Sequence, residues 1–396
     1  MPRPRPSLEF LDPDYHFQPA DLEIQPTENQ PELVSTGEPG DVVTCILSWS
    51  PSDGIKHYDL IAIGSTFEEA DGHESSGRFS CFSTKQAKGG PGIEVKLLYS
   101  RIFPGNPVYS MCAFDISSIL ISTGRDVIML RLDFEMKKLA PLSTFRLPSE
   151  SIALQAIGPF VYASTMYHSL TILQRDGNKL NHYANDIQSR NTLNMAASGD
   201  GTVLLSTMTE HSDAEIVGFS SRVFHKQSDL MFRVGLPLIV NDLRPRFTLQ
   251  VMDASAQSFY ATTIDGTMYS LMMLGNHQWR FLYFLQTLVM GRTHEPLFLD
   301  QRWEKINRWR SGLSAPRPSD RYINADLFLP LLSEGPVGLQ DLLSMELSGS
   351  VADAAGSLAS PLERLRFFCS LTKALLTETH DPVEDAVKWL RKLLRP

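Results

Sequence analysis

A four-residue phrase recurs along the chain and constrains its fold more than any other feature. The phrase occupies residues 120–123, 162–165, 204–207 and 260–263, and each copy ends in two hydroxyl-bearing residues. The first three copies are spaced 42 residues apart, and the fourth follows after 56. Each copy closes a short apolar run and precedes a polar turn and a second apolar run. A period near forty residues with several strands per unit is typical of propeller blades, which usually serve as surfaces for partners.

Short apolar runs rich in β-branched residues predict strands along most of the chain. The expected strands are 42–47, 58–63, 78–82, 93–99, 108–114, 118–122, 127–132, 142–147, 160–165, 169–174, 203–207, 215–219, 259–264 and 267–274. Asp265 and Gly266 separate the last two runs and predict a two-residue type I′ hairpin, because that turn requires positive φ angles. Strands with few helices between them favour meander blades over β-α-β units.

The pattern changes after about residue 276. Residues 279–289 are apolar and predict either a last strand or a short helix. Residues 361–377 then place apolar side chains at helical spacing, and Asp381 with Pro382 predicts the start of a final helix. We therefore predict an all-β protein with C-terminal helices, namely a WD-type β-propeller, seven-bladed or incomplete, followed by a small helical domain. The expected domains are a disordered lead (1–7), the propeller (8–290) and a basic, aromatic connector with the helices (291–396).

Charge and cysteine content narrow the class of protein. The net charge of −9 argues against a surface coated for nucleic acid, although residues 276–321 carry +4 on their own. The four cysteines lack any C-x-x-C spacing and are expected to be buried free thiols in a reducing compartment; they are Cys45, Cys81, Cys112 and Cys369. The chain has no apolar run of about 18 residues and no apolar secretory leader at its start. These observations predict a soluble intracellular protein.

Several runs resemble the C-terminal region shared by a family of large nuclear proteins. They are residues 58–66, 77–82, 107–114, 122–132, the Asp265-Gly266 hairpin and residues 321–327. The family contains the cleavage and polyadenylation specificity factor A subunit, the large subunit of the damaged-DNA-binding complex and splicing factor 3b subunit 3. The resemblance spans residues 8–396. Two features depart from the family pattern: Asn324-Ala325 stands where Asp-Gly is usual, and residues 311–318 and 333–360 look like lineage-specific loops.

The resemblance implies a non-enzymatic nuclear scaffold or adaptor. Its expected partners are proteins of a multisubunit complex, in DNA repair, ubiquitin ligation or pre-mRNA processing. Nucleic acid remains a further possible partner, whereas a membrane and a small-molecule substrate are not expected. Family members are longer and have further propellers upstream, so this chain corresponds to their C-terminal part. The propeller that docks a cullin lies in the upstream portion, and cullin docking is therefore not implied.

No sequence motif supports catalysis. A phosphate-binding loop, a nucleophile elbow, a zinc-protease motif and an EF-hand are all missing from the sequence. The ten histidines are dispersed, and Asp265 beside Gly266 is expected to be a turn former. We predict no catalytic residue, no metal site and no cofactor.

One basic, aromatic cluster is the candidate site for nucleic acid or a partner. Its members are Trp279, Arg302, Trp303, Lys305, Arg308, Trp309 and Arg310. Arginine and tryptophan side chains can stack on bases and neutralise phosphates, so the alternative function is direct RNA or DNA binding through residues 276–321. The competing interpretation is structural, because Trp303, Ile306 and Trp309 follow one another at three-residue steps, as in a helix that packs its aromatic face on the propeller.

Overall fold

The structure is a computed structural model, and it describes a defined subset of the chain. The described residues are 7–10, 32–36, 41–68, 75–86, 93–209, 214–224, 226–236, 238–245, 258–275, 278–279, 281–283, 285–286, 289, 322–344, 363, 365–366 and 382–393. The chain divides into two compact units. Strands β1–β16 lie in the first unit, β20, β21 and the helices lie in the second, and β17–β19 contribute residues to both.

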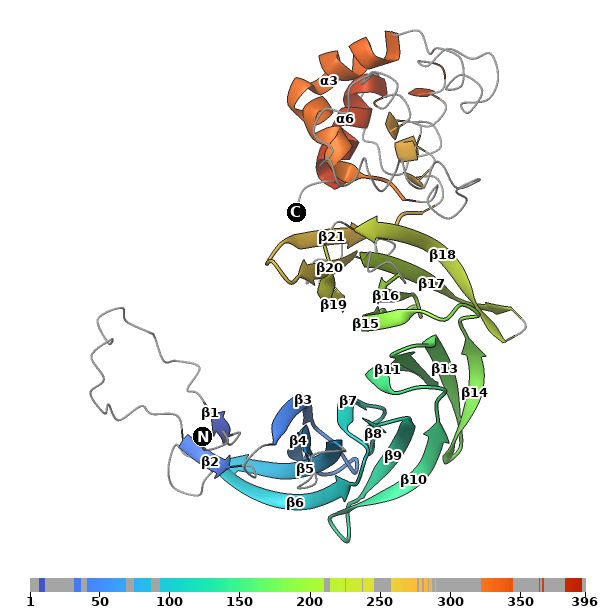
Figure 1. The fold of residues 1–396 in the computed structure, drawn as a ribbon. Helices are drawn as coiled ribbons and strands as arrows, with labels where there is room; N and C mark the ends of the chain where they lie inside the picture. The colour runs from blue at the N-terminus through green and yellow to red at the C-terminus, as the bar shows by residue number, and fades with distance from the viewer. Residues whose placement is uncertain are drawn as a thin grey trace. The chain divides into compact units, whose positions relative to one another are not determined.

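Most of the described chain forms four-stranded blades that follow one another in sequence (Figure 1), and a parallel bridge between Asn185 and Gln227 joins two of them into one eight-stranded sheet. Blade A consists of β3 (Val42–Trp49), β4 (Asp59–Glu68), β5 (Ser75–Gln86) and β6 (Ile93–Phe103). Blade B consists of β7 (Val108–Ala113), β8 (Ser118–Thr123), β9 (Asp126–Asp133) and β10 (Lys138–Arg146). Blade C consists of β11 (Ser151–Ile157), β12 (Phe160–Thr165), β13 (Ser169–Asp176) and β14 (Lys179–Asn185).

Two further blades continue the series. Blade D consists of β15 (Asn191–Ala197), β16 (Val203–Met208), β17 (Ala214–Phe224) and β18 (Gln227–Leu236). Blade E has three described strands, β19 (Val240–Pro245), β20 (Ser258–Thr263) and β21 (Met268–Met272). A separate two-stranded sheet pairs β1 (Ser7–Phe10) with β2 (Glu32–Thr36). The predicted β-propeller with a small C-terminal helical part is confirmed, and the predicted domain limits stay predictions.

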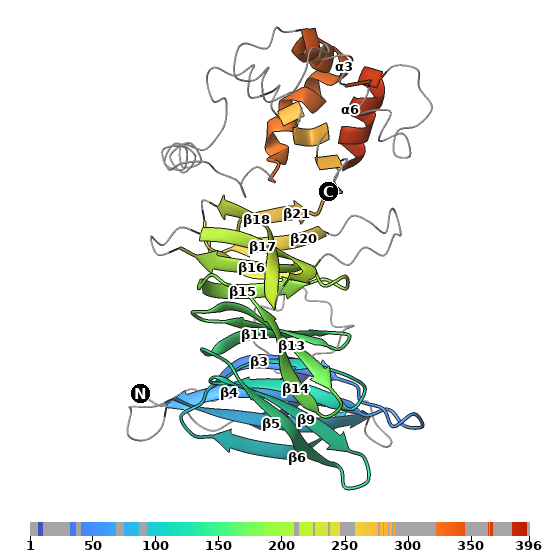
Figure 2. The same cartoon turned by 90° about the vertical axis from the view of Figure 1, so that its right-hand side faces the viewer.

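Apolar cores between successive blades hold the first unit together. Leu60, Ala62 and Phe79 of blade A pack with Ile119, Ile121 and Leu130 of blade B. The opposite face of blade B forms a second core with blade C, to which Leu120, Val127, Met129, Val161, Ala163 and Leu173 contribute. Blade B is therefore buried on both faces, and every residue of its second strand, β8, is buried. Figure 2 shows the blades stacked edge-on in the first unit.

The helical elements of the second unit share one apolar core. They are the 3-10 helix η3 (Ala325–Phe328), α3 (Leu329–Ser344) and α6 (Pro382–Leu393). Phe281, Leu285, Phe328, Leu339, Leu365, Val387, Trp389 and Leu390 are among the buried members of this core. Asn324 caps η3, because its side chain accepts a hydrogen bond from the backbone N–H of Asp326 (3.1 Å). The final helix predicted at Pro382 is confirmed, and the described residues between 278 and 289 are helical.

Two details differ from the sequence-based expectations. The loop expected at 333–360 lies within α3 over residues 333–344, where a kink at Gly335, with a φ of +69°, divides α3 into two helical segments. The hairpin at Asp265-Gly266 is not a type I′ turn, because Gly266 has positive φ (+86°) whereas Asp265 does not. Thr263 instead accepts a bond from the N–H of Gly266 (3.0 Å) and donates its own N–H to Thr267 O (2.9 Å), as in a three-residue loop that ends in a left-handed glycine.

Candidate partner-binding site

Most of the predicted site residues lie outside the described residues. They are Arg302, Trp303, Lys305, Arg308, Trp309 and Arg310. Trp279 is the one member that the structure describes. Its ring stacks on Tyr283 with the centroids 5.2 Å apart and the planes at 23°, and its backbone N–H bonds to Gly275 O (2.9 Å). Trp279 is partly buried, and neither the binding nor the packing interpretation of the cluster is tested by this one residue.

The recurrent hydroxyl phrase closes the second strand in blades B, C and E, and it lies one residue before the end of that strand in blade D. In blades A to D the strand opposite has a β-bulge at this point: the pairing register shifts between Val43 and Cys45, Val108 and Ser110, Ser151 and Ala153, and Thr192 and Asn194. A bulge leaves part of the backbone ladder unmade. In blade B the Ser122 hydroxyl repairs it, because it accepts from Ser110 N (2.9 Å) and donates to Ser110 O (3.2 Å). The two hydroxyl-bearing residues that end the phrase therefore lie directly opposite a β-bulge in blades B, C and D.

The bulged residues occupy equivalent places in four successive first strands. We call Thr44, Tyr109, Ile152 and Leu193 the bulge row. A bulge turns its extra side chain out of the regular alternation. Leu193 is 37% exposed, and Tyr109 and Ile152 are partly exposed. Each of these residues lies on the first strand of its blade, and three of them, Tyr109, Ile152 and Leu193, are aromatic or aliphatic.

Polar bonds link the first strands of neighbouring blades. Thr44 Oγ1 donates to Val108 O (2.5 Å), and Leu154 N donates to Ser110 Oγ (2.9 Å). Gln155 forms a pair of bonds with the backbone of Ala197, at 2.9 Å and 2.7 Å. Strands β3, β7, β11 and β15 are thus fixed relative to one another, and the bulge row is a preformed surface.

A negative charge lies near Tyr109 of the bulge row. Burial raises the pKa of the Tyr109 phenol, and the nearby Glu150 carboxylate and Tyr167 add to the effect. Tyr109 therefore stays an uncharged hydrogen-bond donor at neutral pH. Tyr167 is 54% exposed on the turn before β13. Exposed tyrosine and leucine side chains with no fixed positive charge suit a protein partner better than a phosphate backbone.

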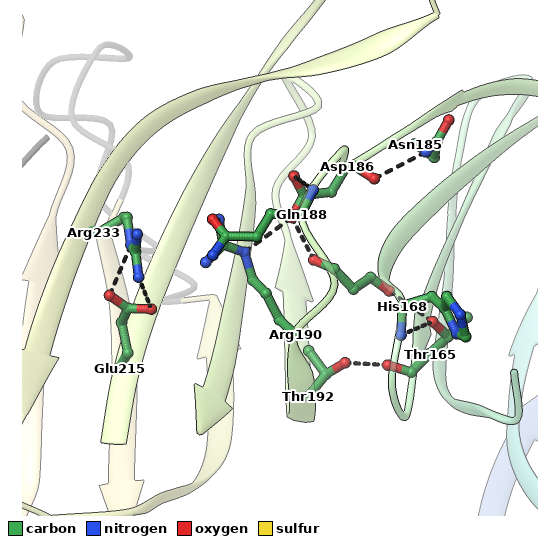
Figure 3. Close-up of polar contacts among 10 residues, drawn as sticks. Thr165, His168, Asn185, Asp186, Gln188, Arg190, Thr192, Glu215 and Arg233 are labelled. Atoms are coloured by element: carbon green, nitrogen blue, oxygen red, sulfur yellow. Dashed lines mark hydrogen bonds and ion pairs between the residues drawn. The ribbon is translucent and has the colours of Figure 1, made fainter. Parts of the chain in front are cut away.

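A buried polar network joins β13 of blade C to the loop that precedes the first strand of blade D (Figure 3). Asp186 Oδ2 accepts from Ser169 Oγ (2.7 Å) and Arg190 Nε (2.9 Å), and its Oδ1 accepts from Gln188 N (3.1 Å). Arg190 also donates to Gln188 Oε1 (2.8 Å). The ion pair is almost fully buried, with 4% of the Arg190 side chain and 7% of the Asp186 side chain exposed. Every partner is satisfied within the fold, so this network positions the loop between the blades and leaves no free group for chemistry.

A second ion pair lies within the second unit. Arg233 donates from Nε and Nη2 to the two carboxylate oxygens of Glu215, at 2.8 Å and 3.1 Å (Figure 3). The Glu215 side chain is 3% exposed and that of Arg233 is 32% exposed. The fork geometry links β17 to β18 and is structural.

The described side chains show no arrangement typical of an enzyme. Burial raises the pKa of Cys81 and of Cys112 to about 12, so both stay thiols and are poor nucleophiles. Cys45, Cys81 and Cys112 are free, as predicted, whereas Cys369 lies outside the described residues. Within the described ranges, no group of three His, Cys, Asp or Glu side chains could hold a metal ion. No helix there is long and apolar enough to cross a membrane.

Sequence reasoning missed the bulge row and the Asp186 network. Strands β11 and β15 were not predicted, because their mixed residues lack clear alternation. A signal was present, since Tyr109, Ile152 and Leu193 recur at steps of 43 and 41 residues, close to the period of the hydroxyl phrase. Asp186 and Arg190 carry no comparable repeat.

The fold and its surface define a class of protein: a β-propeller with a helical C-terminal part, whose Asp186 network and Glu215–Arg233 pair are structural. The chain belongs to the family of the CPSF A subunit region, whose model matches residues 38–307. This confirms the predicted family. Family members are scaffold-type nuclear factors of multiprotein complexes. No curated protein sequence matches the chain.

Proposed function

We propose that this protein is a non-enzymatic scaffold or adaptor of a nuclear multisubunit complex, acting in DNA repair and ubiquitin ligation or in pre-mRNA processing. The observation that carries the proposal is the family match over residues 38–307 on a β-propeller. The bulge row supports it through Tyr109, with the exposed Tyr167 nearby, because tyrosine is among the side chains that most often anchor protein interfaces. The partner surface we propose is the bulge row with Tyr167.

Affinity purification of the full chain from its own cells tests this proposal. Tyr167→Ala combined with Leu193→Glu should leave the fold intact, because both side chains are exposed, and should lower partner recovery by about tenfold or more. Met136→Glu is the matched control, since Met136 is 63% exposed on a turn of blade B outside the bulge row. Unchanged recovery with the double variant would exclude the bulge row, and recovery of no stable partner would exclude the scaffold role.

Direct nucleic-acid binding is the second candidate. It rests on the +4 charge of residues 276–321 and their neighbouring Arg and Trp residues. Binding of RNA or DNA should then fall steeply between low and physiological salt, and Arg308→Glu with Arg310→Glu should abolish it. Binding that does not respond to salt or to this double variant would exclude the basic segment as the contact.

A further inference from the structure

We propose that Arg131 and Ser118, at the junction of blades B and C, form a binding site for a side-chain carboxylate of a partner protein. Both residues lie at the end of blade B where β7 leads into β8, whereas the bulge row lies at the opposite end of the blade. The site itself rests on contacts within these two blades. Only the choice of a protein as its occupant rests on the proposed scaffold role.

Strand register brings the two side chains to one face of blade B. Ser118 and Arg131 are directly paired across β8 and β9, whose register has no bulge. Directly paired residues share a face of the sheet and have Cβ atoms about 4.5–5.5 Å apart. The next pair on that face, Leu120 and Met129, packs in the core with blade C. Ser118 and Arg131 therefore face blade C, at one end of its contact with blade B.

Both side chains hold hydrogen-bond donors that the fold leaves unused. The Ser118 hydroxyl is fully buried, and neither it nor the buried Nε of Arg131 has a hydrogen-bond partner among the described residues. Arg131 as a whole is partly exposed, so a ligand can reach its side chain from solvent. Buried polar groups in proteins are nearly always hydrogen-bonded. Two unused donors on one face therefore indicate that an acceptor is missing between them.

The propeller fold does not require an arginine at this position. The hydroxyl phrase aligns the second strands, and the place of Ser118 is then taken by Leu60 in blade A and by Phe160 in blade C. Leu60 pairs with Ser83, and Phe160 pairs with Gln174. Neither of these pairs carries a charge. The guanidinium is thus particular to blade B, and a general packing role does not account for it.

The neighbouring charges do not compensate that of Arg131. The Asp115 carboxylate lies near Ser118 without the geometry of a hydrogen bond to its hydroxyl. Asp115 accepts instead from the N–H and the hydroxyl of Ser117, at 2.8 Å and 3.1 Å, and forms an ion pair with Arg175. This ion pair balances its own charges. Arg131 is left without a counterion in the part of the chain that the structure describes.

A single carboxylate is the ligand that these groups fit. The guanidinium is a planar fork that matches two carboxylate oxygens, and a hydroxyl supplies a further donor. Asp133 lies two residues after Arg131, Asp176 adjoins Arg175, and both aspartates are exposed. Their negative charges disfavour a chain of phosphates such as a nucleic acid, whereas one carboxylate needs only the charge of Arg131.

Titration of the full chain with sodium acetate tests the site without any partner. At constant ionic strength, the backbone amide resonances of residues 118 and 131 should shift in a saturable way as acetate replaces chloride. No saturable shift, as expected if water satisfies both donors, would overturn the proposal. Tighter binding of inorganic phosphate than of acetate would overturn the choice of a carboxylate.

Substitutions make the titration specific. Arg131→Gln should raise the apparent Kd for acetate by about tenfold or more, and Arg131→Lys by about threefold, because lysine keeps the charge but loses the fork. Arg146→Gln is the matched control, since this arginine is on the same blade with 70% of its side chain exposed. Equal Kd values for Arg131→Gln and Arg146→Gln would contradict a site at Arg131.

Carbodiimide cross-linking distinguishes a protein carboxylate from a free organic acid. In complexes purified from the protein's own cells, Arg131→Lys supplies an amine that should become joined to an Asp or Glu of a partner protein, whereas Arg146→Lys should not reach the same peptide. Cross-links confined to this chain, or none, would overturn the choice of a protein as the occupant. The scaffold role has its own test at Tyr167 and Leu193, and the acetate titration needs no partner, so either proposal can fail alone.

Discussion

Blades A and B are built from similar strands but are buried differently. The second strand of blade B, β8, is buried at every residue, whereas the second strand of blade A, β4, is buried mainly on one face. Both strands carry consecutive aliphatic residues, Leu60–Ile63 in β4 and Ile119–Ile121 in β8. The difference therefore comes from the neighbours of each blade. The comparison teaches that the unit of stability in this fold is the interface between two blades.

The largest loss of stability should follow from breaking the buried ion pair of Asp186 and Arg190, and the exposed pair of Glu384 and Lys388 is the comparison. Asp186→Asn removes the charge that faces the buried Arg190 guanidinium, and we expect it to lower the free energy of unfolding by about 3–5 kcal/mol. Glu384→Gln, in the exposed pair with Lys388 (2.9 Å), should cost less than about 1 kcal/mol. Denaturant unfolding measures both. Similar costs for the two variants would contradict a structural role for the network.

Equivalent isoleucines of blades A and B give the next test. Ile121→Ala leaves a cavity in the core between these blades and should cost about 2–5 kcal/mol. Ile63→Ala at the corresponding position should cost only about 1 kcal/mol, because this side chain is already partly exposed. The same denaturation measurement compares them. Equal losses would mean that the outer face of blade A is covered in the isolated protein.

In blade A, Gly64 and Ser65 lie opposite the β-bulge, at the place where blade B has Ser122 and Thr123. A Cβ atom at this position would lie 2.6 Å from both Cys45 Sγ and Val108 Cγ1, so the residue found in the other blades does not fit here. Gly64→Ser should therefore destabilise the protein by about 1–3 kcal/mol. Gly199→Ser is the matched control, since no atom lies within 4 Å of its added Cβ. A neutral Gly64→Ser variant would contradict the close packing of β4 on β7.

The smallest effect concerns the serines opposite the bulges. Ser122→Ala removes both bonds to Ser110 and should cost about 1–2 kcal/mol. Ser164→Ala should be nearly neutral, because the buried Ser164 hydroxyl has no hydrogen-bond partner in the described part of the chain. Thermal unfolding of the two variants checks this. Equal shifts in Tm would show that the Ser122 hydroxyl does not replace the backbone hydrogen bonds that the bulge leaves unmade.

The sequence predicted the second strand of each blade better than the first or fourth. Second strands such as β8 and β12 are continuous apolar runs that end in the hydroxyl phrase, and this pattern is local. First strands such as β15 carry Asn and Thr, whose bonds reach neighbouring blades and leave no period of two. The loop predicted at residues 333–360 rested on a departure from the family pattern, whereas residues 333–344 belong to α3 despite the non-helical Gly335.

The candidate site was less predictable than the fold. The Asp186 network depends on residues brought together by packing, from Ser169 on β13 to Arg190 before β15, and no spacing rule joins them. The one-sided burial of blade A also depends on what lies beside it. Residue periodicity identifies a strand, but it cannot show how many faces of that strand have a neighbour.

Hydrogen exchange tests the difference between the two blades most directly. Both β4 and β8 are hydrogen-bonded on both edges within their sheets, so their backbone bonding is alike and only the burial of their faces differs. In the purified protein, amides of residues 59–68 should open with a lower free energy than those of residues 118–123. Equal protection of the two strands would contradict an open face on blade A.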